Sequence, residues 1–494
     1  MNKKIFCGVL AAIPLIFFGN ADAAMKLSVA ESVDLAFQNN DSITQAEANK
    51  DSAKWNLSAA RRSAGPSIQW NSQAYRIGGR DYRSANHSHE LYGDPHTQES
   101  VAGYLFGNED FPVSYNGTVG SYRYKNTFSN NINFSYPIYT GGRVENMIKL
   151  RTYGVNSADL NLENTLQTVR YQTINAYYDV LQYINLLNVA DNAVNSAKEQ
   201  LDLITVQYEE GAVAKADVLQ MQVQLANYKQ NRTTAKSRLK VSEATLVNVI
   251  GLPEDTEIET TDKFSYQPYR MTLEECISYA FENRPDNAAA KYNLKQAQAQ
   301  VDATKSGERP QITGVAGKSI SSNSPFKQER NSNWNAGISI QWNIFDNNVT
   351  SAQVQAAKSD VERLSAIAEE LEKRIRLEIN SAYTQMKSAE ENIKIAKVAL
   401  QQAQESYEIA KVRYEEGVDI LLTVTNAQDK LTEAQTNYYT ALYDYNRYKV
   451  TLEKAMGIPI NLNVPRYVSA EEEGKSAKKA FEIAKINEVE EPFK

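Results

Sequence analysis

Three histidines are the residues of this chain whose type most often carries catalysis or metal binding. His87, His89 and His96 lie in a stretch rich in Gly, Asn and Ser. Imidazole nitrogens at this spacing can hold Zn²⁺, but histidines in a polar loop are more often solvated than bound to metal. We therefore predict no metal site and no cofactor at these histidines.

A second run resembles a phosphate-binding loop. Residues 314–319 read Gly-Val-Ala-Gly-Lys-Ser, but Ile312 replaces the first glycine of that motif, and the run falls on a predicted strand. Cys276 lies on a predicted amphipathic helix, where a thiol usually serves as a small packing group. None of these residues predicts an enzyme.

The N-terminus predicts export from the cytoplasm. Two lysines precede the apolar run 5–18, and residues 21–23 read Ala-Asp-Ala, the small-residue pattern that a signal peptidase requires. We predict a signal peptide at 1–23. Its removal leaves Cys276 as the only cysteine, so the mature chain can form no internal disulfide.

Charge and hydropathy exclude two further classes of protein. The net charge of -7 is spread along the chain without a basic stripe, which argues against nucleic acid as a partner. The mean hydropathy is -0.52, and beyond the signal peptide no stretch approaches the roughly 18 apolar residues that a transmembrane helix needs. We therefore expect any membrane crossing to use β-strands.

An internal duplication organises the chain. Residues 27–66 recur at 271–310, so that Glu31 matches Glu275 and Pro66 matches Pro310 at an offset of 244. Farther along, the Tyr-Glu-Glu-Gly run at 208–211 recurs at 414–417, an offset of 206. The first copy therefore carries 38 additional residues. We predict repeats at 24–253 and 271–459, an extended loop at about 78–121, a connector at 254–270 and a charged tail at 460–494.

Each repeat predicts one very long helix. Apolar residues recur at alternating spacings of three and four from Val361 to Tyr414, and the same pattern runs from Val155 to Tyr208 in the first copy. A four-residue step at Ile375 interrupts the alternation and locally unwinds a left-handed supercoil. A helix over 143–208 extends on the order of 100 Å. Shorter helices, about 28–64 and 213–250 in the first copy, are expected to flank it.

A strand pair with one apolar and one polar face precedes each long helix. From Phe128 to Ile138 apolar residues alternate with Ser and Asn, and the same alternation runs from Trp334 to Ile344. This pattern is typical of strands that face lipid on one side and water on the other. Four strands cannot close a barrel, so several protomers must pool them. The four strands are expected at about 67–77, 122–138, 311–320 and 333–345.

Across nearly the whole mature chain this duplicated helix–hairpin–long helix–helix unit resembles the TolC family of outer-membrane efflux proteins. The strand-to-helix corner at 136–143 reads Tyr-Pro-Ile-Tyr-Thr-Gly-Gly-Arg and is similar to the family's aromatic-Pro-Leu-Phe-Asp-Gly-Gly signature. The corner at 342–348 departs from it, with Asn343 in place of proline and Asn347-Asn348 in place of the glycine pair. The resemblance implies a mainly α fold with a membrane β-barrel portion.

The resemblance also implies an assembly and its partners. Three protomers are expected to share a twelve-stranded barrel and a periplasmic α-helical barrel, with outer-membrane lipid around the strands. The channel would form part of a tripartite efflux pump or a type I secretion system and pass substrate outward passively. Its implied partners are a periplasmic adaptor (membrane fusion) protein and an inner-membrane transporter of RND, ABC or MFS type.

The resemblance places functional residues at the two helix turns. The turns would form the adaptor-docking tip, and residues nearby would close the periplasmic entrance. Thr423 and Asn426 occupy positions where well-known members carry aspartates, and Asp419 occupies the position of an arginine. Asp217 and Tyr414 fall on a latch-like Asp–Tyr contact. The implied docking residues are Glu210, Gly211, Ala212, Glu416, Gly417 and Val418.

Two other functions fit long helices: a trimeric coiled-coil surface adhesin and a periplasmic scaffold protein. An adhesin stalk needs neither two copies nor two hairpins with an apolar face. A scaffold has no use for strands that alternate tryptophan with polar residues. The duplication and the strands together favour a channel.

Overall fold

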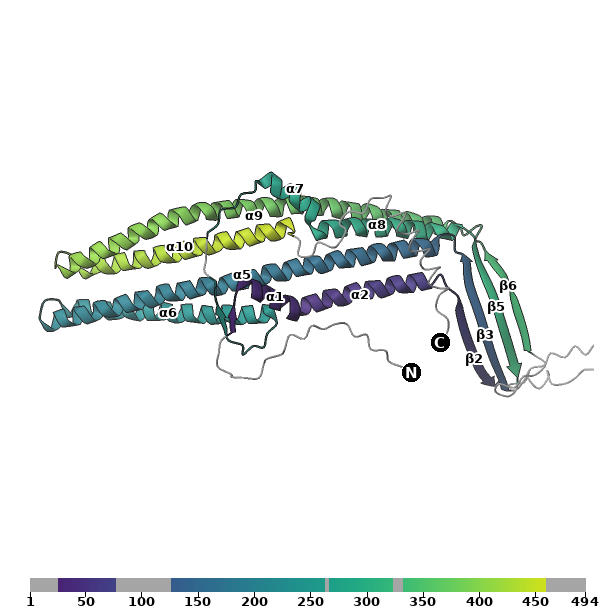
Figure 1. Cartoon of the computed structure of the whole chain (residues 1–494), viewed down its shortest axis with the longest axis horizontal. Helices are drawn as coiled ribbons and strands as arrows, with labels where there is room; N and C mark the ends of the chain where they lie inside the picture. The colour runs from purple at the N-terminus through teal and green to yellow at the C-terminus, as the bar shows by residue number, and fades with distance from the viewer. Residues whose placement is uncertain (1–24, 77–125, 263–265, 323–331, 459–494) are drawn as a thin grey trace, which may run out of the picture. The chain divides into compact units, whose positions relative to one another are not determined.

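The computed structural model describes residues 25–76, 126–262, 266–322 and 332–458 (Figure 1). The predicted signal peptide, the histidine-containing loop and the charged tail lie outside these residues. The chain divides into two compact units. One contains the described parts of 1–57, 149–298 and 359–494, and the other those of 58–148 and 299–358.

Two helical hairpins dominate the first unit. Helices α5 (Arg143–Glu209) and α9 (Val349–Glu415) each have 67 residues, and α6 (Lys215–Ile250) and α10 (Leu421–Met456) each have 36. Figure 1 shows α6 running back beside α5, and α10 beside α9. The ends of these helices all differ by the same offset of 206 residues. The apolar residues from Val155 to Tyr208 and from Val361 to Tyr414, called the apolar seam below, therefore occupy equivalent positions in the two copies.

The predicted seam is buried where the spacing breaks. Ile375, Ile379 and Met386 of α9 are fully buried, and they share a core with Leu452 and Met456 of α10. Helix α7 (Leu273–Asn283) adds Cys276 and Ala280 to the same core. The four-residue step keeps these α9 side chains on one face, so α7 and α10 can cover them together.

Each repeat opens with two helices instead of the single one expected over 28–64. Helices α1 (Val29–Asn39) and α2 (Asp41–Arg62) are separated by Asn40, whose backbone is extended and whose side chain caps α2 by accepting from the Ser42 N–H. In the second repeat α7 and α8 (Pro285–Lys305) are separated by Arg284. Proline disfavours helical geometry in the residue before it, which explains that break.

Both first helices begin with the same capping box. Ser28 accepts from the Glu31 N–H while the Glu31 carboxylate accepts from the Ser28 N–H, and Thr272 and Glu275 repeat the arrangement. The reciprocal bonds satisfy two backbone donors that a helix start leaves free. Strands β1 (Met25–Leu27) and β4 (Ile258–Thr260) pair in parallel nearby.

The second unit is built on one antiparallel sheet in the order β2-β3-β5-β6. A one-residue irregularity between Pro137 and Tyr139 ends the regular pairing of β3 with β5. Strands β2 and β6 are the two edges, and the described residues contain no strand that pairs with their outer sides. The short helix η1 (Ser306–Glu308) precedes β5. The strands are β2 (Ser67–Arg76), β3 (Asn126–Tyr139), β5 (Gln311–Ser322) and β6 (Ser332–Gln341).

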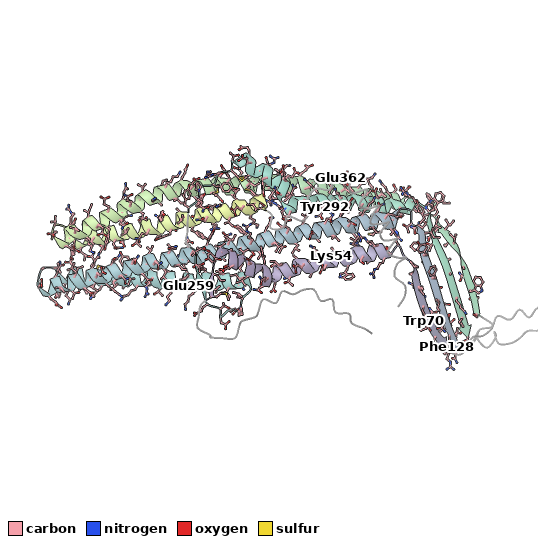
Figure 2. The ribbon with its side chains drawn as sticks, in the orientation of Figure 1. Lys54, Trp70, Phe128, Glu259, Tyr292 and Glu362 are labelled. Carbon is pink, nitrogen blue, oxygen red and sulfur yellow. The ribbon has the colours of Figure 1, made fainter. Side chains whose placement is uncertain are left out.

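One face of this sheet is apolar and solvent-exposed. Trp70 is 61% exposed and Trp334 is 78% exposed, which is far more than large aromatics usually show in a protein surrounded by water. Figure 2 shows Trp70 and Phe128 on this sheet. The opposite face carries Ser, Asn, Gln and Thr. In the described part of the chain no helix is long and apolar enough to cross a membrane.

The two strand-to-helix corners reach the same backbone geometry with different residues. Gly141 and Gly142 have φ of 68° and 92°, and Asn347 and Asn348 have φ of 54° and 64°. Asparagine tolerates the left-handed region better than other residues with a side chain. The Asn pair therefore preserves the turn that the glycine pair makes in the first copy.

We expect Asn348→Val to lower the free energy of unfolding by about 1–2 kcal/mol, because a β-branched residue resists φ near 64°. Asn348→Gly should change it by less than about 1 kcal/mol. Glycine adopts this φ without strain, but the glycine variant has more conformational entropy to lose on folding, and the two effects oppose each other. Urea unfolding followed by circular dichroism measures both. Equal losses for the two variants would contradict the argument.

Candidate functional site

The two helix turns have the same hydrogen-bond geometry. Gly211 has a φ of 78° and Gly417 a φ of 72°. The Val418 N–H donates to the Arg413 carbonyl at 2.9 Å and the Gly417 N–H to the Tyr414 carbonyl at 3.0 Å, and the first turn repeats both bonds. This is a Schellman motif, in which a left-handed glycine closes the helix end.

The surface of both turns is open and acidic. A Cβ added at Gly211 or Gly417 would meet no atom within 4 Å. Ala212 is exposed and Val418 is 66% exposed, so each turn presents a small apolar side chain beside its glycine. The exposed carboxylates make the local potential negative. They belong to Glu209, Glu210, Glu415 and Glu416.

Asp419 joins the second turn to the start of α10 and to the end of α9. Its carboxylate accepts from the Thr423 hydroxyl at 2.7 Å and from the Ile420 N–H at 2.9 Å, and it lies 3.3 Å from Nε of Arg413. The Thr423 hydroxyl, the Ile420 N–H and the Arg413 charge lower the pKa of Asp419. Asn426 is exposed on α10, one turn beyond Thr423. Asp419 and Thr423 are therefore bonded to each other within one protomer.

Asp217 and Tyr414 lie near each other, but within the described chain neither donates to nor accepts from the other. The Asp217 carboxylate accepts from the Ala214 N–H at 3.2 Å, which caps the start of α6. The Tyr414 hydroxyl donates to Oε1 of Gln207 at 3.1 Å. Burial, and secondarily the Asp217 charge, raises the pKa of Tyr414. The link from α9 to the first hairpin thus ends on Gln207, while the Asp217 carboxylate caps α6.

A second link between the hairpins was not predicted from the sequence. Oδ1 of Asp429, on α10, accepts from the Tyr228 hydroxyl at 2.6 Å and from Nε2 of Gln224 at 3.1 Å, both on α6. Tyr228 is buried, and burial together with this bond raises its pKa. The residue that matches Asp429 in the first copy is Val223. The two donors also differ between the copies, because Gln224 matches Lys430 and Tyr228 matches Ala434.

These two links lie over a shared apolar core. Met221 and Leu225 of α6 pack with Ile204 of α5 and with Leu421 of α10, and Tyr414 packs against the same group. Polar links at the rim of an apolar contact fix its register, since the apolar contact alone is not directional. The first and second hairpins are therefore joined near their turns by both kinds of interaction.

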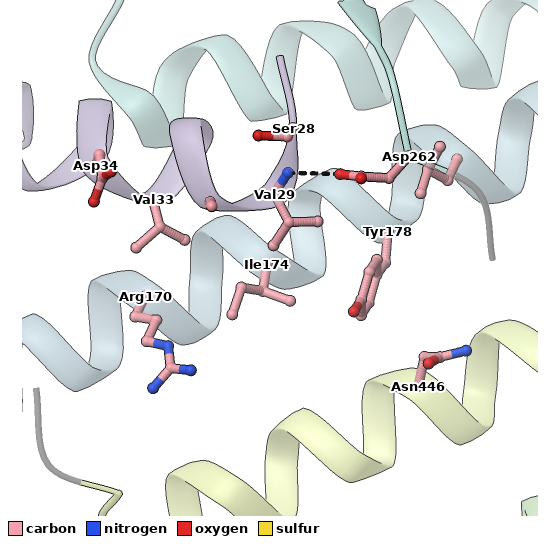
Figure 3. Close-up of a pocket in the computed structure, with 11 residues that line it drawn as sticks. Ser28, Val29, Val33, Asp34, Arg170, Ile174, Tyr178, Asp262 and Asn446 are labelled. Atoms are coloured by element: carbon pink, nitrogen blue, oxygen red, sulfur yellow. Dashed lines mark hydrogen bonds between the residues drawn. The ribbon is translucent and has the colours of Figure 1, made fainter. Parts of the chain in front are cut away.

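A cavity of about 590 Å³ lies away from the turns, between α1, α5 and α10 (Figure 3). One wall is closed by Asp262, whose carboxylate accepts from the Val29 N–H at 2.8 Å and from the Tyr177 hydroxyl at 3.0 Å. Arg170 and Tyr178 line the remainder. Its lining contains neither histidine nor cysteine, and the Asp262 carboxylate is used in these two structural bonds.

Half-buried Glu453 on α10 lines a smaller hollow beside this cavity. Burial raises its pKa, and the charges of Lys449 and Arg170 only partly offset this. Because the folded pKa is raised, ionised Glu453 destabilises the fold. The penalty is absent below the unfolded pKa and grows as pH rises toward the folded pKa.

We therefore expect Glu453→Gln to raise the thermal unfolding midpoint by a few degrees at pH 7 and to leave it nearly unchanged at pH 4. The substitution keeps the shape and removes the charge. Glu408→Gln on the exposed face of α9 is the matched control and should change neither value. A gain for Glu453→Gln at pH 4 that equals the gain at pH 7 would show that charge is not the cause.

The other residues considered for chemistry have structural places or lie outside the described residues. Residues 314–319 lie inside strand β5 and form no loop between strand and helix. Cys276 is fully buried in α7, and burial raises the pKa of its thiol. The described residues contain no group of three or more His, Cys, Asp or Glu that could hold a metal ion. The three histidines lie outside them.

The sequence profile of the family described as "Outer membrane efflux protein" matches residues 32–252 and 276–458. The chain belongs to this family. The two matched segments fall within the repeats predicted at 24–253 and 271–459. As an outer-membrane efflux channel of the TolC family, found in Gram-negative bacteria, it is a transport protein and not an enzyme. The adhesin and scaffold alternatives are thereby excluded.

Individual efflux proteins are distant in sequence and close in fold. The chain is 22% identical over 335 residues to outer membrane efflux protein BepC of Brucella suis, covering 67% of this chain and 73% of BepC. It is 24% identical to outer membrane protein TolC of Escherichia coli, covering 60% of this chain and 63% of TolC. The solved CmeC channel of Campylobacter jejuni aligns with a TM-score of 0.70 at 18% identity, covering 94% of each chain. At this identity the structural match shows the fold alone.

Proposed function

We propose that three copies of this efflux channel pool their strands into one twelve-stranded barrel and conduct substrate passively to the exterior. The observation that carries this is the β2-β3-β5-β6 sheet, which has one apolar face and two edges without a partner in the described chain. Lipid leaves unpaired backbone groups unsatisfied, so the edges of one protomer must pair with those of its neighbours.

Light scattering on protein extracted from outer membranes in mild detergent tests the assembly. We expect three chains per particle, and single-channel currents from the same sample in planar bilayers. A particle of one chain with full helical content would refute the pooled barrel.

We further propose that the two turns form the docking tip for a periplasmic adaptor (membrane fusion) protein, which connects the channel to an inner-membrane transporter of RND, ABC or MFS type. Both glycines leave open space around them, so a partner helix end can approach the backbone closely. Relatives at similar identity are named for pyoverdine export and for cobalt, zinc and cadmium resistance. We therefore propose that the inner-membrane partner, and not the channel, selects the cargo.

Gly211→Trp with Gly417→Trp should reduce export at least about tenfold while the trimer still forms. The indoles fill the space that a partner would enter, and in the free protein a Cβ at either position meets no atom within 4 Å. Gly211→Ala with Gly417→Ala is the control, because it carries the same cost of a positive φ without the bulk. Export assays and adaptor cross-linking measure the effect. Undiminished export in the Trp variant would refute docking at the turns.

A further inference from the structure

The charged residues of the four described strands lie on the apolar face of the sheet, where charges are not expected. These strands contain two charged side chains, Arg76 and Lys318, and both are basic. Lys318 pairs with Ile132 on one side and with Trp334 on the other, and Ile132 pairs with Trp70. Residues paired across an antiparallel sheet share a face. Lys318 therefore stands in the middle of an apolar row.

The opposite face has no charged residue in the described strands. It is lined by amides, hydroxyls and glycine, for example Asn131, Asn133 and Asn335. Transmembrane barrels normally place charges on the water-filled side, because a lysine on the lipid side is costly at mid-depth. Solvation alone would favour Lys318 on the polar face, but it lies on the apolar face.

Along β5, the row that contains Lys318 lies near one limit of the apolar face. Ile312 lies six residues before Lys318 on the same face of β5, which is roughly 20 Å of an apolar band that is about 25 Å tall. β5 ends at Ser322, four residues beyond Lys318. Tryptophans are enriched at the level of lipid headgroups, and Trp70 and Trp334 stand in this same row.

Lys318 is exposed and makes no ion pair within the described part of the chain. Its cation is therefore available for an external anion. The exposed indoles on either side of the row offer apolar surface to the attached glycerol and acyl groups. Charge complementarity favours an anionic lipid over a zwitterionic one.

We propose that Lys318 binds the phosphate of an anionic lipid in the leaflet nearer the end of β5 at Ser322, with Trp70 and Trp334 packed against the same lipid. This rests on the proposed insertion of the strands into the outer membrane. It assigns a lipid-binding role to a row of four side chains, Trp70, Ile132, Lys318 and Trp334. Arg76 lies on the same face at the end of β2, but it is six residues from Trp70, roughly 20 Å along the strand, and is too far away to bind the same phosphate.

Tryptophan fluorescence tests the site directly. The full chain is reconstituted in phosphatidylcholine vesicles containing brominated phosphatidylglycerol or brominated phosphatidylcholine, in a background where Trp55 and Trp342 are phenylalanine. We expect brominated phosphatidylglycerol to quench the fluorescence of Trp70 and Trp334 with about fivefold higher apparent affinity than brominated phosphatidylcholine. One cation at the membrane surface predicts a difference of this size. Lys318→Gln should abolish this preference, and Lys318→Arg should retain it.

Two controls separate the site from net charge. Lys318→Gln with Ser319→Lys keeps the charge but moves it to the polar face, and it should not restore the preference. Lys430→Gln on exposed α10 should leave the preference intact. Equal quenching by both lipids in the unsubstituted protein, or a preference that survives Lys318→Gln, would overturn the proposal. Absence of quenching by either lipid would instead refute the insertion of the strands.

Discussion

Gly457→Ala is expected to lower the free energy of unfolding by about 2–5 kcal/mol. Gly457 ends α10 with a φ of 69°, and a Cβ there would lie 2.8 Å from both Cα and Cγ of Arg284. A left-handed alanine costs about 1–2 kcal/mol, and forcing an atom into a packed contact costs about 1–3 kcal/mol more.

Arg284 cannot move aside to relieve the contact. Its guanidinium donates to Asp286 at 2.7 Å, to Glu378 at 2.8 Å and to the Ala455 carbonyl at 2.8 Å. It also forms the break between α7 and α8, so its backbone is fixed by the proline that follows. Gly457 is therefore required both for its φ and for its lack of a side chain.

Urea unfolding of the two variants Gly457→Ala and Gly417→Ala provides the comparison. Gly417 has a similar φ of 72° but open surroundings, so its alanine variant should lose only about 1–2 kcal/mol. Gly251→Ala should follow Gly457→Ala, because its Cβ would lie 2.8 Å from the Asn39 carbonyl at the break between α1 and α2. If Gly417→Ala and Gly457→Ala lowered the free energy of unfolding by similar amounts, the contact between the new Cβ and Arg284 would not contribute to the loss.

The long helices and the strands were predictable because their signals are local and repeated. The apolar seam of α9 records burial directly, and Ile375, Ile379 and Met386 on that seam are fully buried. The alternation of β3 and β6 records one apolar and one polar face. Each pattern also occurs in both repeats, so a resemblance that arose by chance in one copy would not recur in the other.

The break at Asn40 shows where local signals failed. Pro285 announces the corresponding break in the second copy, but the first copy has no proline there. The available signal was Asn40 followed by Asp41 and Ser42, a typical helix start, inside a stretch that reads as continuous helix. A capping residue within an apolar periodicity is ambiguous from the sequence alone, because contacts far apart in the sequence, such as the close approach of Gly251 to Asn39, leave no local pattern.

The links near the turns could be predicted only in part. The turns themselves follow from Gly211 and Gly417, since the left-handed geometry is a property of the residue. The partner of Tyr414 depends on how the two hairpins pack, and in the structure its hydroxyl donates to Gln207 while Asp217 accepts from the Ala214 N–H. Side-chain pairs between helices far apart in the sequence leave no local pattern, which is why Asp429 was missed.

Asp429→Asn with Tyr228→Phe is expected to open the periplasmic entrance of the proposed trimer. In the structure the Asp429 carboxylate accepts from Tyr228 at 2.6 Å and from Gln224 at 3.1 Å, and these two donors lie one helical turn apart on α6. The bonds join the return helices of the two hairpins beside the apolar core near the turns. An entrance that opens by separating the hairpins must break them.

The energy of these bonds sets the size of the effect. A hydrogen bond to a charged group contributes about 1.5–3 kcal/mol, and solvent screening around exposed Asp429 reduces this. Three symmetric copies would still bias the closed state by about 2–4 kcal/mol in total. Since 1.4 kcal/mol is tenfold in an equilibrium, the open population should rise at least about tenfold, until the open state predominates.

Single-channel recording in planar bilayers measures the open population and the conductance. Lys430→Gln is the matched control, because it removes one charge beside Asp429 while its own bond goes to Glu433 on the same helix. Tyr414→Phe tests the other link and should open the entrance less, since Tyr414 bonds to neutral Gln207. An intact trimer whose currents are unchanged by Asp429→Asn with Tyr228→Phe would show that the hairpins separate elsewhere, or that the apolar core alone holds them closed.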